Sequence, residues 1–250
     1  MDMKYRITSE TKVVGNITLH RIECVTAFGD VGCGEKGGWI ESEKNLSQDG
    51  NAWVGEYAMV FGNAVVRGYA VVSGNAWVYE SAVVRGYAWV YGNAKVGGNA
   101  RISGNAWIDG NAWIDENAWV YGNAKVGGNA RISGNARISE YARISEYAIV
   151  GGNAEVCGNA WVGENAMVCE NADYIVFKNW WSSGRYFTWT RSNNKWRVGC
   201  FFGTGEELIA KAYKDSEKSG REYERVVKYV NDILKEEEYN DNGNRNKREG

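Results

Sequence analysis

Residues 92–115 read GNAKVGGNARISGNAWIDGNAWID, which is one six-residue phrase written four times with small changes. From Asn51 the same phrase continues to residue 174 as 21 hexads without a slip. Counted from the Asn position, the second residue is Ala in all 21 hexads, and the fourth is Val or Ile in 20. A helical period of 3.6 cannot carry a strict period of six, whereas a short strand followed by a corner can. The repeat therefore predicts a solenoid of short strands.

Each hexad divides into a strand and a corner. The Ala-x-Val triplet alternates inward, outward and inward, as a strand requires. The residue before the Asn position is Gly in 14 hexads and Glu in seven. Glycine and asparagine tolerate left-handed backbone angles, so this part of the phrase predicts the corner.

The hexads resemble the hexapeptide-repeat, left-handed parallel β-helix family, in which a small residue follows an aliphatic one by four places, as Ala58 follows Val54. This resemblance implies three hexads per triangular coil. Twenty-one hexads then give about seven coils, roughly 30 Å tall at ~4.8 Å per layer. The expected fold class is mainly β: a left-handed parallel β-helix with an N-terminal cap and a small C-terminal α+β domain.

The outward residues of the first coils are apolar, and a lone prism would expose more apolar area than a monomer normally shows. They predict a homo-oligomer interface, which the family resemblance makes a trimer. Its residues are Trp53, Met59, Val65, Val71, Trp77, Val83 and Trp89. The alternative is that such rows only stabilise adjacent layers.

A band of cations follows further along the repeat, at the successive outward positions Lys125, Arg131, Arg137 and Arg143. The band is a candidate contact surface for an acidic partner. The alternative is a solvated belt that the nearby Glu140 and Glu146 partly neutralise.

The flanks depart from the repeat. Residues 1–50 are predicted to cap the first coil and protect its open edge. The stretch TLHRIECV at 18–25 and the residues after it resemble YdcK-like proteins, a family of uncharacterised hexapeptide acetyltransferases, and related phage-encoded proteins. Residues 175–239 are predicted to form a β-hairpin and two helices, and residues 240–250 a disordered tail.

The C-terminal unit contains the residues that we expect to carry specific recognition. RYFTWTRSNNKWRVGCFF at 185–202 reads as a hairpin turning at Asn193 and Asn194. It places Phe187, Trp189, Trp196, Val198, Cys200 and Phe202 on one face. Capping boxes at Thr204/Glu207 and Ser219/Glu222 predict the helix starts. Aromatic residues alternate here with cations, which suits phosphate-bearing ligands or acidic protein surfaces. The candidate binding residues are Trp180, Trp181, Arg185, Arg191, Lys195 and Arg197, and we expect Trp180 and Trp181 to form an exposed pair.

The family resemblance implies acyl transfer from acetyl-coenzyme A with a histidine base, but the chain has one histidine, His20, and it lies outside the coils. No loop interrupts 51–174, so the catalytic features of the family do not carry over. We therefore expect a non-catalytic scaffold or binding protein, without cofactor or metal. Its resemblance to phage proteins suggests an accessory protein that acts on a host factor, such as a defence system. The alternatives are a hexapeptide acyltransferase that uses His20, and sequestration of a small nucleotide between subunits.

Composition sets the remaining limits. The net charge of −2 does not point to nucleic acid. Five scattered cysteines without a CxxC motif predict neither a disulfide framework nor a zinc site, and favour a reduced cytoplasmic setting in a bacterial host cell. The charged start and the lack of an apolar run of about 20 residues predict no signal peptide and no membrane span.

Overall fold

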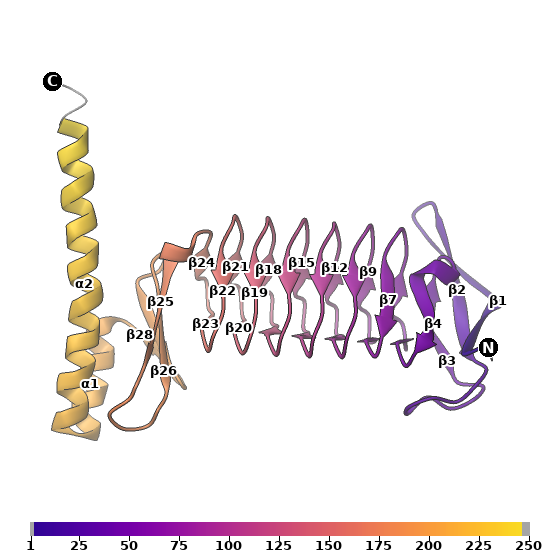
Figure 1. The fold of residues 1–250 in the computed structure, drawn as a ribbon, viewed down its shortest axis with the longest axis horizontal. Helices are drawn as coiled ribbons and strands as arrows, with labels where there is room; N and C mark the ends of the chain where they lie inside the picture. Colours follow the sequence, from indigo (N-terminus) through magenta and orange to yellow (C-terminus); the bar gives the residue numbers. More distant parts are fainter. Residues whose placement is uncertain (1–2, 247–250) are drawn as a thin grey trace. The chain divides into compact units, whose positions relative to one another are not determined.

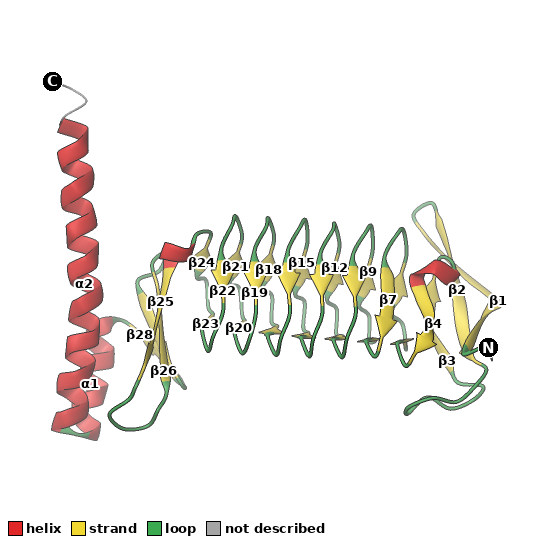
Figure 2. Ribbon diagram, in the orientation of Figure 1, coloured by secondary structure: helices red, strands yellow, loops and turns green. Residues whose placement is uncertain are grey.

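The structure, a computed structural model, describes residues 3–246. The chain divides into two compact units. One comprises Met1–Tyr174 with Thr190–Asn193, and the other Ile175–Trp189 with Asn194–Gly250. Stacked strands make up most of the first unit, and an antiparallel sheet with two helices makes up the second (Figures 1 and 2).

The N-terminal cap is an antiparallel meander that becomes part of the solenoid. Strands β1 (Tyr5–Val14), β2 (Ile17–Cys24) and β3 (Lys36–Ile40) pair in sequence order, and β3 then pairs in parallel with β6 of the repeat. A 3-10 turn, η1 (Glu43–Asn45), leads to β4 (Leu46–Gly50), which pairs with β7. The cap therefore starts two of the three parallel ladders before the repeat begins.

The hexads form three parallel ladders, each of which pairs residues 18 apart. Face 1 contains β6 (Met59–Val60), β9 (Trp77–Val78), β12 (Lys95–Val96), β15 (Trp113–Ile114), β18 (Arg131–Ile132), β21 (Ile149–Val150) and β24 (Met167–Val168). Face 2 contains β7 (Val65–Gly68), β10 (Val83–Val84), β13 (Arg101–Ile102), β16 (Trp119–Val120), β19 (Arg137–Ile138) and β22 (Glu155–Val156). Face 3 contains β5 (Trp53–Val54), β8 (Val71–Val72), β11 (Trp89–Val90), β14 (Trp107–Ile108), β17 (Lys125–Val126), β20 (Arg143–Ile144) and β23 (Trp161–Val162). The predicted parallel solenoid of about seven turns is confirmed; its left-handed sense stays a prediction.

The interior of the solenoid consists of the Ala and Val/Ile positions of the hexad. These side chains are at most 1% exposed from Ala52 to Val168. Burial of each Val or Ile contributes roughly 1.5–3 kcal/mol before the cost of chain ordering. Backbone hydrogen bonds join successive coils, as from Trp107 N to Ala124 O at 2.9 Å. Small and branched side chains thus fill a narrow prism without cross-links, and all five cysteines are free thiols.

The corners of the coils need left-handed backbone angles, and glutamate adopts them as well as glycine. At Gly110 the φ angle is 63°, and an added Cβ would lie 2.7 Å from the carbonyl oxygen of Gly128. Glu116 has φ 57°, and its Oε2 accepts a hydrogen bond of 2.6 Å from the backbone N–H of Gly134 in the next coil. Glu56 and Glu80 accept equivalent bonds. The carboxylate thus offsets the strain of a left-handed non-glycine residue.

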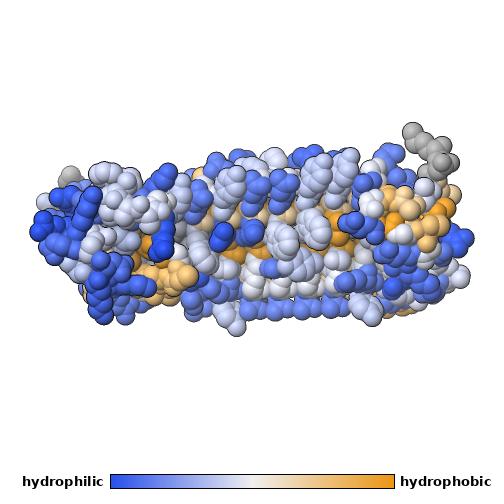
Figure 3. Space-filling view, turned by 90° about the horizontal axis from the view of Figure 1, so that it is seen from below, coloured by the Kyte–Doolittle hydropathy of each residue, from blue (hydrophilic) through white to orange (hydrophobic). Residues whose placement is uncertain are grey.

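Side-chain ladders run along the corners as well. Asn93, Asn111 and Asn129 are linked by amide hydrogen bonds of 3.1 and 3.0 Å. Figure 3 shows hydrophilic side chains lined up along one edge of the solenoid, and apolar colour between the rows. The rings of Tyr69 and Tyr87 stack in the same slot with centroids 4.7 Å apart. These ladders lie outside the apolar core and connect successive coils there.

The corner glutamates give a stability prediction. We expect Glu116→Ala to lower the free energy of unfolding by about 1–3 kcal/mol, because the left-handed strain remains while the charged hydrogen bond is lost. Glu116→Gly should lose less, since glycine relieves the strain. Urea unfolding of the two variants beside the wild type measures the difference. An alanine variant as stable as the wild type would show that the carboxylate does not compensate for strain.

The twenty-first hexad does not form a coil. The repeat predicted an outward strand residue at Asp173, but residues Asn171–Asp173 form a 3-10 turn, η2. The Asp173 carboxylate accepts backbone hydrogen bonds from Cys169 and Glu170 at 2.7 and 2.9 Å, a local pairing that competes with the strand. The phenol of Tyr174 donates to Glu155 O at 2.8 Å, and burial raises its pKa to about 12. The last hexad therefore closes the ladder of face 2.

The C-terminal unit is a four-stranded sheet with two helices. Its strands are β25 (Tyr174–Lys178), β26 (Tyr186–Thr190), β27 (Lys195–Val198) and β28 (Phe201–Gly203), in that order. Its core contains the buried side chains Phe187, Trp189, Trp196, Val198, Leu208, Val227 and Val230. The prediction that Cys200 and Phe202 continue this face was wrong. Gly199, with φ 59°, turns the chain after β27, so that Phe201 packs on the core and Cys200 is exposed.

The two helices are α1 (Gly205–Asp215) and α2 (Glu217–Asn246). The capping box of Thr204 and Glu207 is confirmed. The second box is wrong, because α2 begins earlier and Ser219 N donates to Ser216 Oγ at 3.1 Å. Residues 240–246 are helical where the sequence predicted a disordered tail, since an established helix gains a bond with each added residue; 247–250 lie outside the described residues. None of the described helices is long and apolar enough to cross a membrane.

Candidate binding sites

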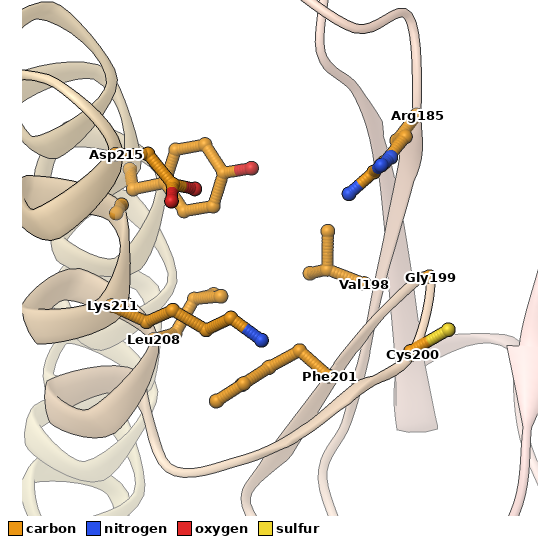
Figure 4. Close-up of a pocket in the computed structure, with 10 residues that line it drawn as sticks. Arg185, Val198, Gly199, Cys200, Phe201, Leu208, Lys211 and Asp215 are labelled. Carbon is orange, nitrogen blue, oxygen red and sulfur yellow. The ribbon is translucent and has the colours of Figure 1, made fainter.

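A cavity of about 390 Å³ lies within the C-terminal unit, between the turn from β27 to β28 and the two helices. Its apolar wall comprises Val198, Phe201 and Leu208, and Figure 4 shows Arg185 and Lys211 directed toward the space from opposite sides. The Lys211 ammonium lies over the ring of Phe201, 5.5 Å from its centroid. An apolar wall with converging polar groups is the usual composition of a small binding site.

The electrostatics of this cavity are mixed, with two cations and one carboxylate. Asp215 and Tyr223 line the wall that the two helices form. Burial raises the pKa of Tyr223, while a hydrogen bond with Asn179 and the charge of Arg185 act in the opposite direction. The phenol therefore stays protonated at neutral pH. The cavity presents an excess of one positive charge and a neutral hydroxyl, which favours an anionic group.

The two adjacent tryptophans predicted as an exposed pair have different positions. Trp180 is 79% exposed. Trp181 is half-buried and packs against the core, with its ring centroid 6.0 Å from that of Phe187 and 5.8 Å from that of Tyr223. The prediction of an exposed pair is wrong for Trp181, because the sheet and α2 supply an apolar surface for it. A Trp181→Ala change would therefore test stability rather than recognition.

The cations near the hairpin turn are not gathered into one site. Arg191 lies with the last coil, where its backbone N–H donates to Asp173 O at 2.8 Å and its Nε to Ala172 O at 3.2 Å. Lys195 and Arg197 are half-buried on β27, and the guanidinium of Arg197 lies 5.9 Å from the ring centroid of Phe202. Of the six residues predicted here, the cavity uses Arg185 alone.

The sequence reasoning missed Lys211, Asp215 and Tyr223 in this cavity. Lys211 and Asp215 are four residues apart in α1 and so lie on one face of that helix. That spacing was the available signal. The turn at Gly199, which directs β28 toward the helix, was not readable from hydrophobic alternation.

The predicted cationic band is present on the solenoid. Lys125, Arg131, Arg137 and Arg143 are all exposed, and the strands place Lys125 and Arg143 in register on face 3. Arg131 lies on face 1 and Arg137 on face 2. The band thus circles the prism, and one pair of cations is adjacent.

The predicted apolar interface is partly covered by the chain itself. Trp53 and Met59 are 5% and 4% exposed, because the cap covers them: Phe28 meets Trp53 edge-on, and Trp39 pairs with Met59. These two residues are therefore wrong as oligomer contacts. The other members remain half-buried or exposed on the surface: Val65, Val71, Trp77, Val83 and Trp89.

The one histidine lies in the cap. His20 is half-buried on β2, in register with Thr11 of β1 and Ile40 of β3. This position is among antiparallel strands and not on a coil of the repeat. The strands β5–β24 follow each other at the hexad spacing without an inserted loop.

The stacked coils agree with the comparisons to known proteins. Residues 130–146 match the model of the YdcK β-solenoid repeat. This part of the solenoid resembles the YdcK repeat. A segment of 68 residues, 24% of this chain, is 35% identical to a protein from Escherichia coli strain K12 named "Uncharacterized acetyltransferase YdcK". The matched segment covers 21% of that relative, so the likeness concerns a part of each protein and not its whole length.

Proposed function

We propose that this protein is a non-catalytic binding protein in which the YdcK-like solenoid is a scaffold and the C-terminal cavity binds an acidic segment of a protein partner. The observation that carries the proposal is the convergence of Arg185 and Lys211 on an apolar cavity of about 390 Å³. A cation over an apolar wall binds a carboxylate while the wall packs the neighbouring aliphatic groups. The exposed indole of Trp180 adds an apolar contact near the chain segment that carries Arg185.

Charge reversal at the cavity tests this function. We expect the Arg185→Glu/Lys211→Glu variant to lose the partner, because two attractive contacts become repulsive. Lys214→Glu is the matched control, since Lys214 is an exposed cation of α1 outside the cavity lining. Tagged proteins are captured from native lysate, and bound proteins are quantified by mass spectrometry.

The decisive outcome is a partner that the wild type and the control retain and the double variant loses. Its affinity, measured with the purified partner, should fall as ionic strength rises. A partner retained equally by the double variant would contradict the cavity as the recognition site. Circular dichroism of each variant shows whether the unit remains folded.

Acyl transfer is the second candidate, because the matched relative is named as an acetyltransferase. We rank acyl transfer below the binding function because His20 lies in the cap and not on a coil of the repeat. Saturable turnover of acetyl-coenzyme A that is lost in His20→Ala would favour this candidate over the binding function. Self-association, which we propose through the accessible rows around Trp77 and Trp89, is measured separately by sedimentation.

A further inference from the structure

A second concave site lies on the solenoid itself, along face 3. It is a groove of about 410 Å³. Its residues lie on or directly after five successive strands of face 3, β11 to β23: Tyr91, Trp107, Asp109, Lys125, Val126, Gly127, Gly128, Arg143, Ile144, Ser145 and Trp161. Both ends of the groove are indole rings, and the two outward residues between them are cations.

The groove exists because one corner position lacks a side chain. The corner slot after face 3 holds Asp109, Gly127 and Ser145 in three successive coils. A Cβ at Gly127 would collide with the carboxylate of Asp109, which occupies that space. The floor of the groove is therefore formed by the carboxylate of Asp109 and the backbone of Gly127 and Gly128.

The two indole rings are held in place by hydrogen bonds. Trp107 Nε1 donates to the Tyr91 hydroxyl at 2.9 Å, and that hydroxyl donates to Asp109 Oδ2 at 3.0 Å. Trp161 Nε1 donates to Ser145 Oγ at 3.0 Å. Rings fixed in this way lose little conformational entropy when a planar group stacks on them.

The two cations between the rings are adjacent and lack acidic partners. Lys125 and Arg143 are paired in register on neighbouring strands, about 4.8 Å apart. Among the residues that the structure describes, neither forms an ion pair. Their contacts are with the rings: Lys125 lies 5.8 Å from the centroid of Trp107, and Arg143 lies 5.5 Å from that of Trp161. Like charges one rung apart repel each other, and an anion with several oxygens removes that repulsion.

We infer that this groove binds a small phosphate monoester that carries a planar ring. The phosphate contacts Lys125 and Arg143 together, and the ring stacks on Trp161, because one face of Trp107 is already stacked against Trp89. A phosphate suits the pair better than a carboxylate, because its charge approaches −2 and its three oxygens can bridge two donors. The volume is in the range of small-ligand sites. This site is on the solenoid and is separate from the C-terminal cavity.

Isothermal titration of the full-length protein with adenosine 5′-monophosphate tests the inference. We expect saturable binding below ~1 mM ligand. Lys125→Gln/Arg143→Gln should weaken it at least ~10-fold, since both charged contacts with the phosphate are lost. Trp161→Leu should weaken it about 5-fold or more through lost stacking. The matched control is Arg131→Gln/Arg137→Gln, which removes two equally exposed cations from the other faces and should leave the affinity unchanged.

The ligand series separates the parts of the proposal. Phenyl phosphate binding as tightly as the nucleotide would assign the site to aromatic phosphates in general, and tighter nucleotide binding would assign it to nucleotides. Inorganic phosphate or adenosine binding as tightly as the nucleotide would overturn the proposal, since both parts of the ligand must contribute. No binding of any aromatic phosphate, or binding lost in Arg185→Glu/Lys211→Glu but kept in Lys125→Gln/Arg143→Gln, would also overturn it.

Discussion

The Ile102→Asp variant is expected to lose the cooperative unfolding transition of the solenoid. Ile102 is fully buried in β13, on the inner side of face 2. An aspartate there removes the apolar contacts, which alone are worth about 2–5 kcal/mol, and buries a carboxylate without a partner, which adds several kcal/mol more. Because each coil contacts only its neighbours, the damage should spread along the stack as lost nearest-neighbour stabilisation.

The neighbouring residue gives the control for this variant. Arg101 is exposed on the same strand, and its outward neighbours in register are Val83 and Trp119. Arg101→Asp should change the free energy of unfolding by no more than about 0.5 kcal/mol. Both variants are followed by far-UV circular dichroism during urea titration. Equal midpoints for the two would show that the in-out alternation of the hexad does not govern stability.

The second large effect is expected where the cap meets the first coil. Gly38 of β3 is buried, and an added Cβ would lie 2.6 Å from Ala58 O and 2.8 Å from Val54 Cγ1. We expect Gly38→Val to displace β3 from β6 and to lower the free energy of unfolding by about 3 kcal/mol or more, because backbone atoms on the other side cannot yield. Displacement would expose the first coil as an unpaired strand edge, which promotes aggregation.

Gly32→Ala is the control for the cap. A Cβ at Gly32 would be 4.0 Å from its nearest contact, the Glu35 carboxylate, so this variant should retain wild-type stability. Thermal unfolding and light scattering measure stability and aggregation together. If Gly38→Val melted at the wild-type temperature without aggregation, the cap would not be needed to protect the first coil.

The two units differ in how far their sequence predicts their structure. In the repeat, every hexad has the same alternation of buried and exposed residues and the same kind of corner, so the two signals agree from Ala52 to Val168. Residues 18 apart then fall in register, as Lys125 and Arg143 do. In the C-terminal unit no segment is repeated. There the predicted capping box at Thr204 was right, whereas the one at Ser219 was wrong because Ser216, three residues earlier, caps the same helix.

The sites were predicted less completely than the fold. The cationic band could be read from the outward slot of the hexad. The adjacent pair of this band, Lys125 and Arg143, followed from the stacking of residues 18 apart. The groove, however, also depends on the missing side chain at Gly127 and on hydrogen bonds from each indole to a residue 16 positions earlier, from Trp107 to Tyr91 and from Trp161 to Ser145. Those contacts join side chains at different positions of the hexad in neighbouring coils, and a comparison of the same position from hexad to hexad does not detect them. The cavity of the C-terminal unit similarly required the turn at Gly199.

By itself the sequence determined the period and the buried and exposed positions of each strand, because a strict repeat leaves one consistent way to bury its apolar residues. The three faces were implied by the family resemblance, and the pairing of residues 18 apart confirms them. Only the tertiary structure decided which exposed residues are accessible and which act together. Trp53 and Trp89 occupy the same slot of the hexad, yet the cap buries the first and leaves the second 45% exposed. Accessibility depends on what non-repetitive segments cover, and hydrophobic periodicity carries no information about that.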